Sequence, residues 1–382
     1  MEAVVKHTNS FWQGRRVLVT GHTGFKGSWL TLWLLELGAE VSGFALAPES
    51  IDQSHQPLFQ RLDLASRLGD HHQIGDIRDS EKLSSAITHI QPEVVLHLAA
   101  QPLVRKSYED PLGTWSTNVQ GSLQLLEALK PLQRPCAVVM VTTDKVYENQ
   151  EWVYGYRESD TLGGNDPYSA SKAAAELAIA SWRNSFCGSA RHQTQHLAIA
   201  SARAGNVIGG GDWAADRIVP DAVRALSKAN PISVRHPKAT RPWQHILEPL
   251  SGYIKLAEAL LHTQTALSQS ETEAENIFAS PFNFGPAVAD NRSVRELVEE
   301  MLQHWKGSWC GGSDLEAPHE AGRLHLQIDK AHHQLGWQPR WDFTTTVART
   351  MSWYRAVHEG ANPLECCLTD LNAYTGKDSS AY

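Results

Sequence analysis

Two residues four positions apart, Tyr168 and Lys172, have the spacing of a general base and its activator. Asp166 is a good helix N-cap and Pro167 suits the first helical position, so a helix beginning here would carry both side chains on one face. A lysine ammonium beside a phenol favours the phenolate and lowers the tyrosine pKa from about 10. Tyr168 could then accept the proton of a substrate hydroxyl. The alternative interpretation is an ordinary amphipathic helix start.

Three polar residues, Thr143, Asp144 and Lys145, directly follow an apolar run at 137–142. If that run is a strand, they lie at its carboxyl end, where sheets of this kind bind ligands. Thr143 could bind the same substrate oxygen as Tyr168, Asp144 could donate a proton, and Lys145 could serve as a base or stabilise charge. A turn with two solvated charges is the alternative.

A glycine-rich turn with the spacing GxxGxxG, formed by Gly21, Gly24 and Gly27, stands between an apolar run and a helix-like segment. Glycines at this spacing allow a tight turn and close approach of a pyrophosphate. The following helix would offer unpaired N–H groups and the positive end of its dipole. The turn therefore predicts a dinucleotide site, with a ligand-free strand–helix turn as the alternative.

The choice between NAD and NADP depends on the end of the next strand, where an acidic residue is expected to hold the adenosine ribose. The segment 44–46 reads Phe-Ala-Leu, and no Asp or Glu follows until Glu49. No arginine that could hold a 2′-phosphate stands there, so NAD is favoured. Asp76 follows the expected third strand and could accept the adenine amino group, or it could be a plain loop residue.

The segments that must position these residues alternate between strands and helices. We expect strands at 16–20, 40–46, 93–99, 137–142 and 196–203, and helices at 28–37, 80–89, 118–129, 166–182 and 249–262. The strand runs are almost continuously apolar, which is typical of a parallel sheet buried on both faces. The predicted fold is α/β, a doubly wound parallel Rossmann sheet with a smaller, mixed C-terminal substrate-binding lobe. We expect an exposed polar loop at 266–275.

The expected division has three parts: a dinucleotide-binding Rossmann domain at 12–205, to which some later segments return, the lobe at 206–355, and a tail at 356–382. The net charge of −8 argues against a nucleic-acid binder. Five cysteines without a CxxC pair and histidines without HExxH spacing predict no disulfide framework and no metal site. No membrane-length apolar run or signal peptide is visible, so we expect no membrane partner and a cytoplasmic protein.

Several of these motifs, in this order, resemble the extended short-chain dehydrogenase/reductases, the NAD-dependent epimerase/dehydratase family. They are the glycine turn, His97-Leu-Ala-Ala100, Thr143-Asp144 and Tyr168-xxx-Lys172, and the resemblance covers about residues 15–345. Longer strings are similar, more narrowly, to the CDP-glucose 4,6-dehydratase branch: GHTGFKGSWL (21–30), HLAAQPLVRKSY (97–108), TTDKVYEN (142–149), RAGNVIGGGDWAADRIVPD (203–221), RPWQHILEPLSGY (241–253) and LGWQPRW (335–341).

The resemblance implies a lyase that converts CDP-glucose to CDP-4-keto-6-deoxy-glucose in deoxysugar and cell-surface polysaccharide biosynthesis, without net redox change. Tyr168, supported by Lys172 and Thr143, would take the C4 hydroxyl proton while NAD stores the C4 hydride. A base would then remove the C5 proton, Asp144 would protonate the departing C6 hydroxyl, and the hydride would return to C6. Lys145 stands where dTDP-glucose and GDP-mannose dehydratases have their glutamate base. It could take that role if burial or a cationic neighbour such as Lys172 keeps it partly neutral.

The resemblance also implies the binding residues. For NAD they are Gly21, Thr23, Gly24, Phe25, Lys26, Gly27, Asp76, Ile77, Leu98, Ala99, Ala100, Gln101, Asn118, Thr142, Tyr168, Lys172 and Arg203. For the nucleotide sugar, which the lobe would bind, they are Asn206, Trp213, Arg217, Arg241, His245 and Arg292. Arg217 and Arg241 would hold the diphosphate or form surface ion pairs instead. Trp213 and His245 would contact cytosine or ribose or pack in the core. Family members imply a homodimer, or a dimer of dimers, through helices near 112–130 and 168–185.

Two rival functions stay open on the sequence. The first is another nucleotide-sugar dehydratase or a 4-epimerase, although a simple 4-epimerase needs no acid such as Asp144 for loss of a C6 hydroxyl. The second is a non-catalytic NAD-binding scaffold, against which the presence of Thr143, Tyr168 and Lys172 argues.

Overall fold

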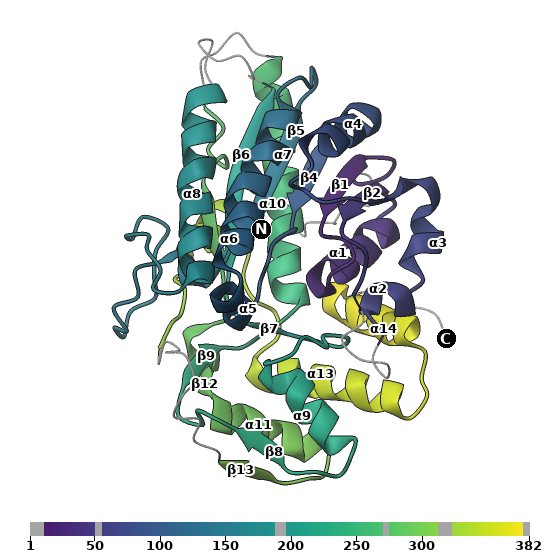
Figure 1. Cartoon of the computed structure of the whole chain (residues 1–382), viewed down its shortest axis with the longest axis vertical. Coiled ribbons are helices and arrows are strands. Elements are labelled where there is room, and N and C mark those ends of the chain that lie inside the picture. Colours follow the sequence, from purple (N-terminus) through teal and green to yellow (C-terminus); the bar gives the residue numbers. More distant parts are fainter. Residues whose placement is uncertain (1–10, 50–55, 188–195, 270–274, 312–322, 377–382) are drawn as a thin grey trace, which may run out of the picture.

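The central feature is a seven-stranded sheet. The computed structural model describes residues 11–49, 56–187, 196–269, 275–311 and 323–376. The strand order is β11-β6-β5-β4-β1-β2-β3, and every pair in it is parallel (Figure 1). The chain order reverses between β1 and β4, which confirms the predicted doubly wound Rossmann sheet. The strands are β1 (Arg16–Thr20), β2 (Glu40–Ala45), β3 (His72–Ile74), β4 (Val94–His97), β5 (Cys136–Val141), β6 (Leu197–Ala204) and β11 (Pro281–Phe284).

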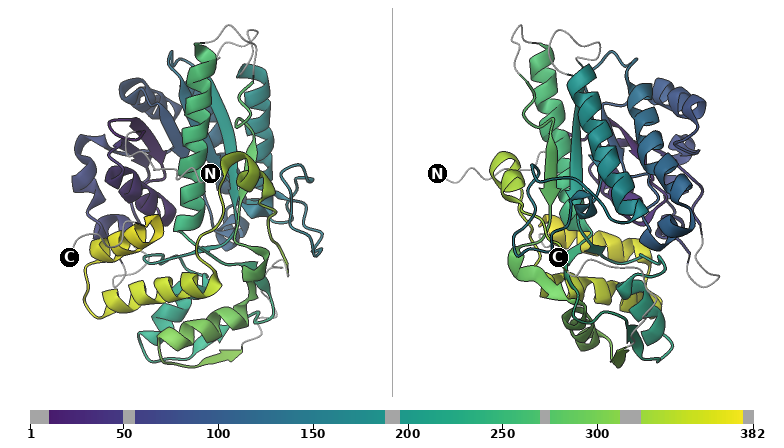
Figure 2. Two further views of the ribbon diagram at one scale, coloured as in Figure 1. Left: turned by 180° about the vertical axis from the view of Figure 1, so that it is seen from behind. Right: turned by 60° about the vertical axis from the view of Figure 1, so that its left-hand side comes forward.

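The strands are apolar throughout because helices cover both faces of the sheet. Alternate strand residues belong to different cores: Val17 and Val19 pack in one, and Leu18 between them packs in the other. The first core is closed by α1 (Phe25–Glu36) and α10 (Leu247–Ser268). The second is closed by α4 (Ser80–Ile90), α7 (Gly121–Leu129) and α8 (Pro167–Phe186) (Figure 2).

Several helix boundaries differ from those predicted. Helix α1 begins three residues early, since Gly24 is its N-cap. The helix expected at 118 continues from α6 (Pro111–Trp115) through a π-helical turn at Ser116–Gln120. The start of this helix could have been predicted from the sequence, because Asp110 followed by Pro111 is a typical helix N-cap. In the structure Asp110 caps α6 and accepts a 2.8 Å hydrogen bond from the Gly113 N–H. The loop expected from 266 was partly wrong: 266–268 end α10, and 270–274 lie outside the described residues.

Most of the remaining elements form the C-terminal lobe, which is mixed, as expected. Its strand pairs are β7 (Val207–Ile208) with β10 (Gln244–His245), β8 (Ile232–Val234) with β13 (Trp309–Gly311), and β9 (Thr240–Pro242) with β12 (Asn291–Ser293). Its helices are α9 (Ile218–Leu226), α11 (Val294–His304) and α13 (Phe343–His358). The sheet side adds the short helices α2 (Leu58–Arg61), α3 (Leu64–Leu68) and α5 (Val104–Glu109), together with α12 (Asp329–Leu335), which packs against β11 and α10. Short 3₁₀ turns lie at Gly69–His71, Asp144–Val146 and Val288–Asp290.

The segment expected to be a tail contains a docked helix, α14 (Pro363–Thr375), which lies beside α1 (Figure 1). The Tyr374 ring packs edge-on against Trp33 of α1, with centroids 5.8 Å apart. Its hydroxyl donates a 2.8 Å hydrogen bond to the buried Glu248 of α10, and its carbonyl accepts one of 2.7 Å from Arg340. Residues 363–375 are therefore joined to the sheet region and to the lobe.

Two further expectations concern membranes and metals. None of the described helices is long and apolar enough to span a membrane. Within the same described ranges, no three His, Cys, Asp or Glu side chains are grouped as metal ligands would be.

Candidate active site

A cavity of about 1400 Å³ opens at the carboxyl ends of β1, β4, β5 and β6 and continues beneath the C-terminal lobe. This is the place where doubly wound sheets bind ligands, because the strand order reverses there and neighbouring loops diverge. The predicted residues that line it are Gly21, Thr23, Gly24, Phe25, Lys26, Gly27, Asp76, Ile77, Leu98, Ala99, Ala100, Thr142, Thr143, Lys145, Tyr168, Lys172, Asn206, Arg217 and Arg241.

The glycine turn fits a dinucleotide closely. Gly21 has a φ of +75°, and a Cβ there would lie 2.7 Å from the backbone nitrogen of Ala99. A Cβ on Gly27 would lie 2.1 Å from the carbonyl oxygen of Gly21. Helix α1 has no side-chain cap at Gly24, and its first turn lines the cavity. The turn therefore has the tight backbone and the exposed N–H groups that a pyrophosphate needs.

Beyond the turn, the two strand ends carry different groups. The Thr23 hydroxyl donates a 2.9 Å hydrogen bond to the carbonyl of Leu46, which ties the turn to the end of β2. Asp76 follows β3 and pairs with Arg78 at 2.5 Å, and this hydrogen bond holds the pKa of Asp76 below its usual value. Arg78 also lines the cavity and was missed from the sequence, although it stands two residues after Asp76.

The loop after β5 carries the polar residues expected there. The Thr143 hydroxyl donates a 3.0 Å hydrogen bond to Oδ1 of Asp144. Lys145 Nζ lies 3.4 Å from the same carboxylate oxygen and 3.4 Å from the side-chain oxygen of Asn206. Asp144 is only 1% exposed, and its Oδ2 has no hydrogen-bond partner among the described residues. One carboxylate oxygen of Asp144 is therefore bound by Thr143 and Lys145, while the other makes no hydrogen bond within the described part of the chain.

Tyr168 and Lys172 lie on α8, whose start is fixed as predicted. Asp166 accepts a 2.9 Å hydrogen bond from the Ser169 N–H, and Pro167 takes the first helical position. Both side chains are buried, and Lys172 Nζ lies 3.4 Å from the carbonyl of Val141 on β5. The helix therefore holds both side chains at the end of β5, beside Thr143.

The electrostatics of this pair differ from the sequence-based expectation. Burial raises the pKa of Tyr168 to about 12, the hydrogen bond with Thr143 lowers it in part, and the Asp144 carboxylate raises it again. The prediction that Lys172 lowers the pKa of Tyr168 was therefore wrong for the protein alone. Burial lowers the pKa of Lys172 to about 8, and Glu176 opposes that change. Burial likewise lowers the pKa of Lys26, to about 8.

Glu176 is a buried residue that the sequence analysis missed. Its carboxylate accepts hydrogen bonds from Thr142 on β5 at 2.5 Å and from Ser201 on β6 at 2.7 Å. It also pairs with both ends of the Arg203 guanidinium, at 3.0 and 2.9 Å. Glu176 thus ties α8 to two strands. The signal was present, since Glu176 stands four residues after Lys172 on the same helix face.

Thr142 and Arg203, which were predicted to contact the cofactor, belong to the hydrogen-bond network of Glu176. The Thr142 hydroxyl points to Glu176, although the residue itself lines the cavity. The Arg203 guanidinium also bonds the hydroxyl of Tyr147, and Arg203 is absent from the cavity lining. The direct cofactor contacts expected of these side chains are therefore not what the structure shows. The strand face, set by the alternation along β6, directs Arg203 toward α8 instead.

Gln101 and Asn118 shape the loop after β4 rather than lining the cavity. The Asn118 side chain accepts a 2.9 Å hydrogen bond from the Gln101 N–H and donates one of 2.9 Å to Ser171. The Gln101 side chain bonds Leu103 and Thr114. The two residues connect this loop to α8 one position before Lys172.

The arginines and aromatic residues predicted for the substrate separate into two groups. Arg217 lines the cavity and pairs with Asp212 at 2.7 Å, which raises its pKa. Arg241 lines the cavity from β9. Arg105 and Arg235 also line it and were missed, because nothing in their local sequence marks them as facing a ligand.

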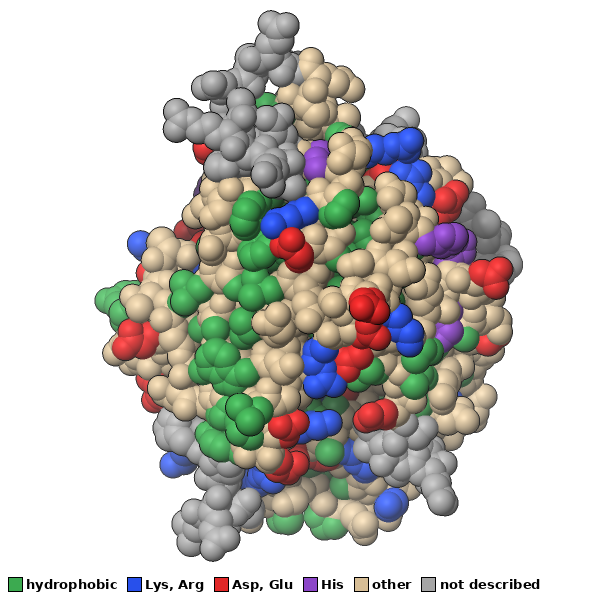
Figure 3. Space-filling model, turned by 45° about the horizontal axis from the view of Figure 1, so that its top comes forward, with side chains coloured by type: hydrophobic (Ala, Val, Ile, Leu, Met, Phe, Trp, Pro, Cys, Tyr) green, Lys and Arg blue, Asp and Glu red, His purple; other side chains and the backbone are tan. Residues whose placement is uncertain are grey.

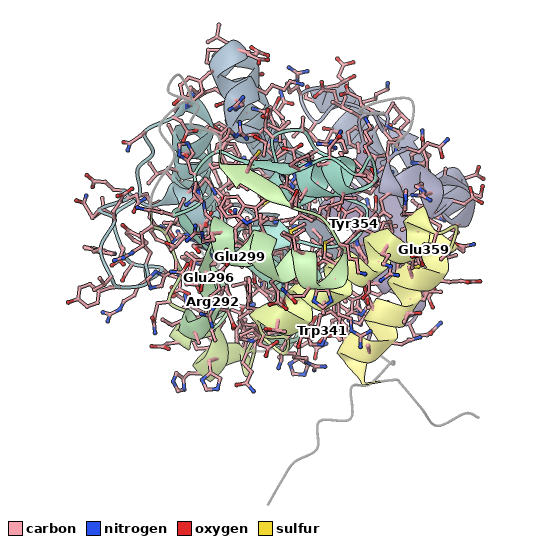
Figure 4. All side chains as sticks on the ribbon, turned by 90° about the horizontal axis from the view of Figure 1, so that it is seen from below. Arg292, Glu296, Glu299, Trp341, Tyr354 and Glu359 are labelled. Carbon is pink, nitrogen blue, oxygen red and sulfur yellow. The ribbon has the colours of Figure 1, made fainter. Side chains whose placement is uncertain are left out.

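Trp213, His245 and Arg292 do not reach the cavity lining, so the structure does not support their predicted substrate contacts. Trp213 packs edge-on against Tyr354, and His245 packs between Trp29 and Trp341. Burial lowers the pKa of His245 to about 3, so it is a neutral core residue. Arg292 lies on the outside of the lobe, 3.3 Å from Glu296 (Figure 4).

Comparisons with known proteins agree with this geometry. Residues 18–350 match the family model described as GDP-mannose 4,6 dehydratase. The CDP-glucose 4,6-dehydratase of Salmonella typhimurium is 47% identical over 367 residues, which are 96% of this chain and 97% of that protein.

Solved structures share the fold. DesIV, a dTDP-glucose 4,6-dehydratase from Streptomyces venezuelae with NAD and TYD bound, has a TM-score of 0.72 at 23% identity, over 91% of this chain and 99% of that one. A dTDP-glucose 4,6-dehydratase from Bacillus anthracis in complex with NAD has a TM-score of 0.69 at 21% identity, over 92% of this chain and 100% of that one.

Proposed function

The chain belongs to the GDP-mannose 4,6 dehydratase family, and on this premise we propose that it dehydrates CDP-glucose to CDP-4-keto-6-deoxy-glucose with NAD as a bound catalyst. One observation carries the proposal: Thr143, Lys145, Tyr168 and Lys172 line the same cavity as the glycine turn. The buried Asp144 is absent from the lining but is bonded to Thr143 and Lys145. This set contains an acid for removing a hydroxyl group, which a 4-epimerase would not need. The 47% identity to a CDP-glucose 4,6-dehydratase supports the nucleotide.

The residues of the cradle fit NAD. When bound, NAD supplies a positively charged ring that takes up a hydride and later returns it. In our proposal, Gly21, Gly24 and Gly27 hold its pyrophosphate with Thr23, Phe25 and Lys26 around it. Asp76 and Ile77 meet the adenine, and Leu98, Ala99 and Ala100 line the middle of the site. Gln101, Asn118, Thr142 and Arg203 support the site through their hydrogen bonds instead of touching the cofactor.

The first half of the reaction oxidises C4 of the sugar. We assign Tyr168 as the base that takes the C4 hydroxyl proton, and Thr143 as the hydrogen-bond partner of the same oxygen. The buried phenol has a raised pKa, so it needs positive charge close by before it can act as a base. In the protein alone Lys172 does not lower this pKa, so we propose that the positive ring of bound NAD would supply the charge together with the ammonium of Lys172, which is protonated below about pH 8.

The second half removes water across C5 and C6. The 4-keto group makes the C5 hydrogen acidic, and Lys145 Nζ is the base that we assign to it. Asp144 gives its proton to the departing C6 hydroxyl, which leaves as water. The Asn206 side chain and Asp144 hold Lys145 Nζ between them, at 3.4 Å from each. When the hydride returns to C6, C5 would regain a proton from Lys145. Tyr168 must then lose the proton that it took from the C4 hydroxyl, and Asp144 must take one up, before the next turnover.

The nucleotide part of the substrate would lie under the lobe. We propose that Arg217 and Arg241, which both line the cavity there, contact the diphosphate. The proposed binding units are residues 12–205 for the dinucleotide and 206–355 mainly for the nucleotide sugar. Helix α10 and strand β11 return to the sheet, and the docked α14 replaces the simple tail that we expected.

We further propose a homodimer that pairs through α6, α7 and α8. Leu112 and Trp115 of α6 and Leu177 of α8 are 82, 41 and 62% exposed, so large apolar side chains stand uncovered on these two helices. Figure 3 shows hydrophobic side chains gathered on the face that carries these helices. The expected cytoplasmic location is part of this proposal, because NAD and nucleotide sugars are available there.

The test is an incubation of the purified protein with CDP-glucose and NAD, followed by an assay for a 4-keto-6-deoxy sugar. Parallel reactions contain dTDP-glucose, UDP-glucose and GDP-mannose. Product from CDP-glucose alone would support both the reaction and the nucleotide. Binding of NAD without product from any of the four would remove the dehydratase proposal.

A further inference from the structure

An ion-pair cluster spans the cavity between the sheet side and the lobe. Arg105 comes from α5, Arg235 follows β8 in the lobe, and Asp216 precedes α9. The Arg105 and Arg235 guanidinium groups both lie 3.3 Å from the same oxygen, Oδ1 of Asp216. All three residues line the cavity. One carboxylate therefore joins two cations that come from opposite sides of the site.

The backbone at Asp216 is adapted to this position. Its φ of +61° is in the left-handed region, which aspartate and asparagine enter more readily than most residues. The next residue, Arg217, is the N-cap of α9 and pairs with Asp212. The loop 212–217 thus presents one carboxylate to Arg105 and Arg235 and a separate one to Arg217.

The attraction within this cluster is divided. The two guanidinium groups lie against a single carboxylate oxygen at the cavity surface. The side chains of Arg105, Asp216 and Arg235 are 38, 46 and 31% exposed. Ion pairs with this exposure are weak, because water screens the attraction. A diphosphate carries more negative charge than a carboxylate and offers several oxygens to guanidinium donors.

We propose that Asp216 is an internal substitute for the substrate's diphosphate: it holds Arg105 and Arg235 while the cavity is empty, and the nucleotide diphosphate takes its place. The inference rests on the proposed function, since it assumes a substrate with a diphosphate. It adds Arg105 and Arg235 to the residues that bind the substrate and strengthen its affinity. Asp216 would weaken that affinity, because it competes with the diphosphate for the two arginines. Substrate binding would then connect the sheet side to the lobe through the two arginines.

The test measures the affinity of cytidine diphosphate by isothermal titration calorimetry, with cytidine as the ligand without phosphate. Asp216→Asn keeps the shape and suits the left-handed backbone, but it removes the competing charge. It should lower the Kd for cytidine diphosphate about three- to tenfold. Arg105→Gln and Arg235→Gln should each raise that Kd by a similar factor. The Kd for cytidine should be unchanged in all three variants.

The matched control is Glu299→Gln, which removes the Arg295–Glu299 ion pair of 3.6 Å on α11, outside the cavity lining (Figure 4). It should leave both affinities unchanged. Asp216→Gly, which also tolerates a positive φ, checks that the result for Asp216→Asn does not come from a distorted loop. Thermal unfolding of each variant establishes that it is folded.

The sign of the change decides the inference. If Asp216→Asn and Asp216→Gly weaken the binding of cytidine diphosphate as the arginine variants do, Asp216 stabilises the bound state and the inference is wrong. It is also wrong if the arginine variants bind as the wild type does. The proposed function is tested separately by product formation from CDP-glucose. If no product forms, the same panel is measured with whichever of the cytidine, uridine, thymidine or guanosine diphosphates the wild type binds. If none binds, the inference fails as well.

Discussion

Glu176 should control the pH at which Lys172 loses its proton, and the pH dependence of turnover should reveal this. Lys172 acts as an ammonium in the proposed reaction, so activity should fall as pH rises through its pKa of about 8. Burial lowers this pKa and Glu176 raises it. Replacing Glu176 with Gln removes the raising contribution. The pKa of Lys172 should therefore fall, and the alkaline limb of the kcat profile should move to lower pH.

The size of this change follows from the helix geometry. Side chains four residues apart on a helix have Cβ atoms about 5–6 Å apart. A full charge at that distance is worth about 3 kcal/mol at an effective dielectric constant of about 20. Glu176→Gln leaves the Arg203 charge in place, whereas removal of Arg203 as well would raise the Lys172 pKa in part. We therefore expect the pKa to fall by about two units, or about 3 kcal/mol, in Glu176→Gln, and by about one unit when both charges are removed.

The assay is kcat for CDP-glucose between pH 5 and 9. The limb should lie near pH 8 in the wild type and near pH 6 in Glu176→Gln. Ser201→Ala removes a 2.7 Å hydrogen bond to Glu176 but no charge, so its limb should stay near pH 8. Glu176→Gln also leaves Arg203 buried without its partner, which costs about 3–5 kcal/mol. The double variant Glu176→Gln with Arg203→Met removes both charges, so its limb should lie between the other two, near pH 7. An unchanged limb in the folded double variant would refute the reasoning.

Three other changes test separate parts of the structure. Gly27→Ala places a Cβ 2.1 Å from the Gly21 carbonyl oxygen, so the affinity for NAD, measured by fluorescence titration, should fall at least about tenfold. Wild-type affinity in this variant would contradict the assignment of the glycine turn as the pyrophosphate site. Lys145→Met should allow formation of reduced cofactor but stop deuterium exchange at C5 in heavy water, and wild-type exchange would exclude Lys145 as the base. Burial raises the pKa of Asp370 to about 7, so its protonated form stabilises the fold at low pH, and that stability is lost as pH rises from about 4 through 7. Asp370→Asn should therefore stabilise the protein at pH 8 by about 1–2 kcal/mol and have little effect at pH 4, and equal effects on Tm at both pH values would count against this.

The sheet and half of the site were predictable because their signals are local. A run such as Val17–Val19 is apolar on consecutive residues only when both faces are buried, so each strand could be read alone. Parallel strands bring their carboxyl ends to one edge. Residues just after β1, β5 and at the start of α8 therefore had to meet, and the structure brings Gly21, Thr143 and Tyr168 to one cavity.

The substrate-binding residues were less predictable, because the type of a residue does not show which way its side chain points. His245 and Trp213 are residues that stack on bases, but aromatic neighbours from α1 and α13 enclose them. Those neighbours are distant in sequence, so no local pattern could reveal the enclosure. The pKa of Tyr168 was misjudged for a related reason, since the spacing to Lys172 shows a neighbour but not the burial that outweighs it.

The docking of α14 on α1 and α10 bears on how the protein is made. Tyr374 contacts Trp33 and donates to Glu248, and β11 at residues 281–284 forms one edge of the sheet. The ribosome releases these segments long after the glycine turn, so the dinucleotide domain cannot complete its packing while most of the chain is being synthesised. We expect the nascent protein to gain NAD affinity in one late step, after residue 375 has left the ribosomal exit tunnel, and to expose the apolar side of α1 until then.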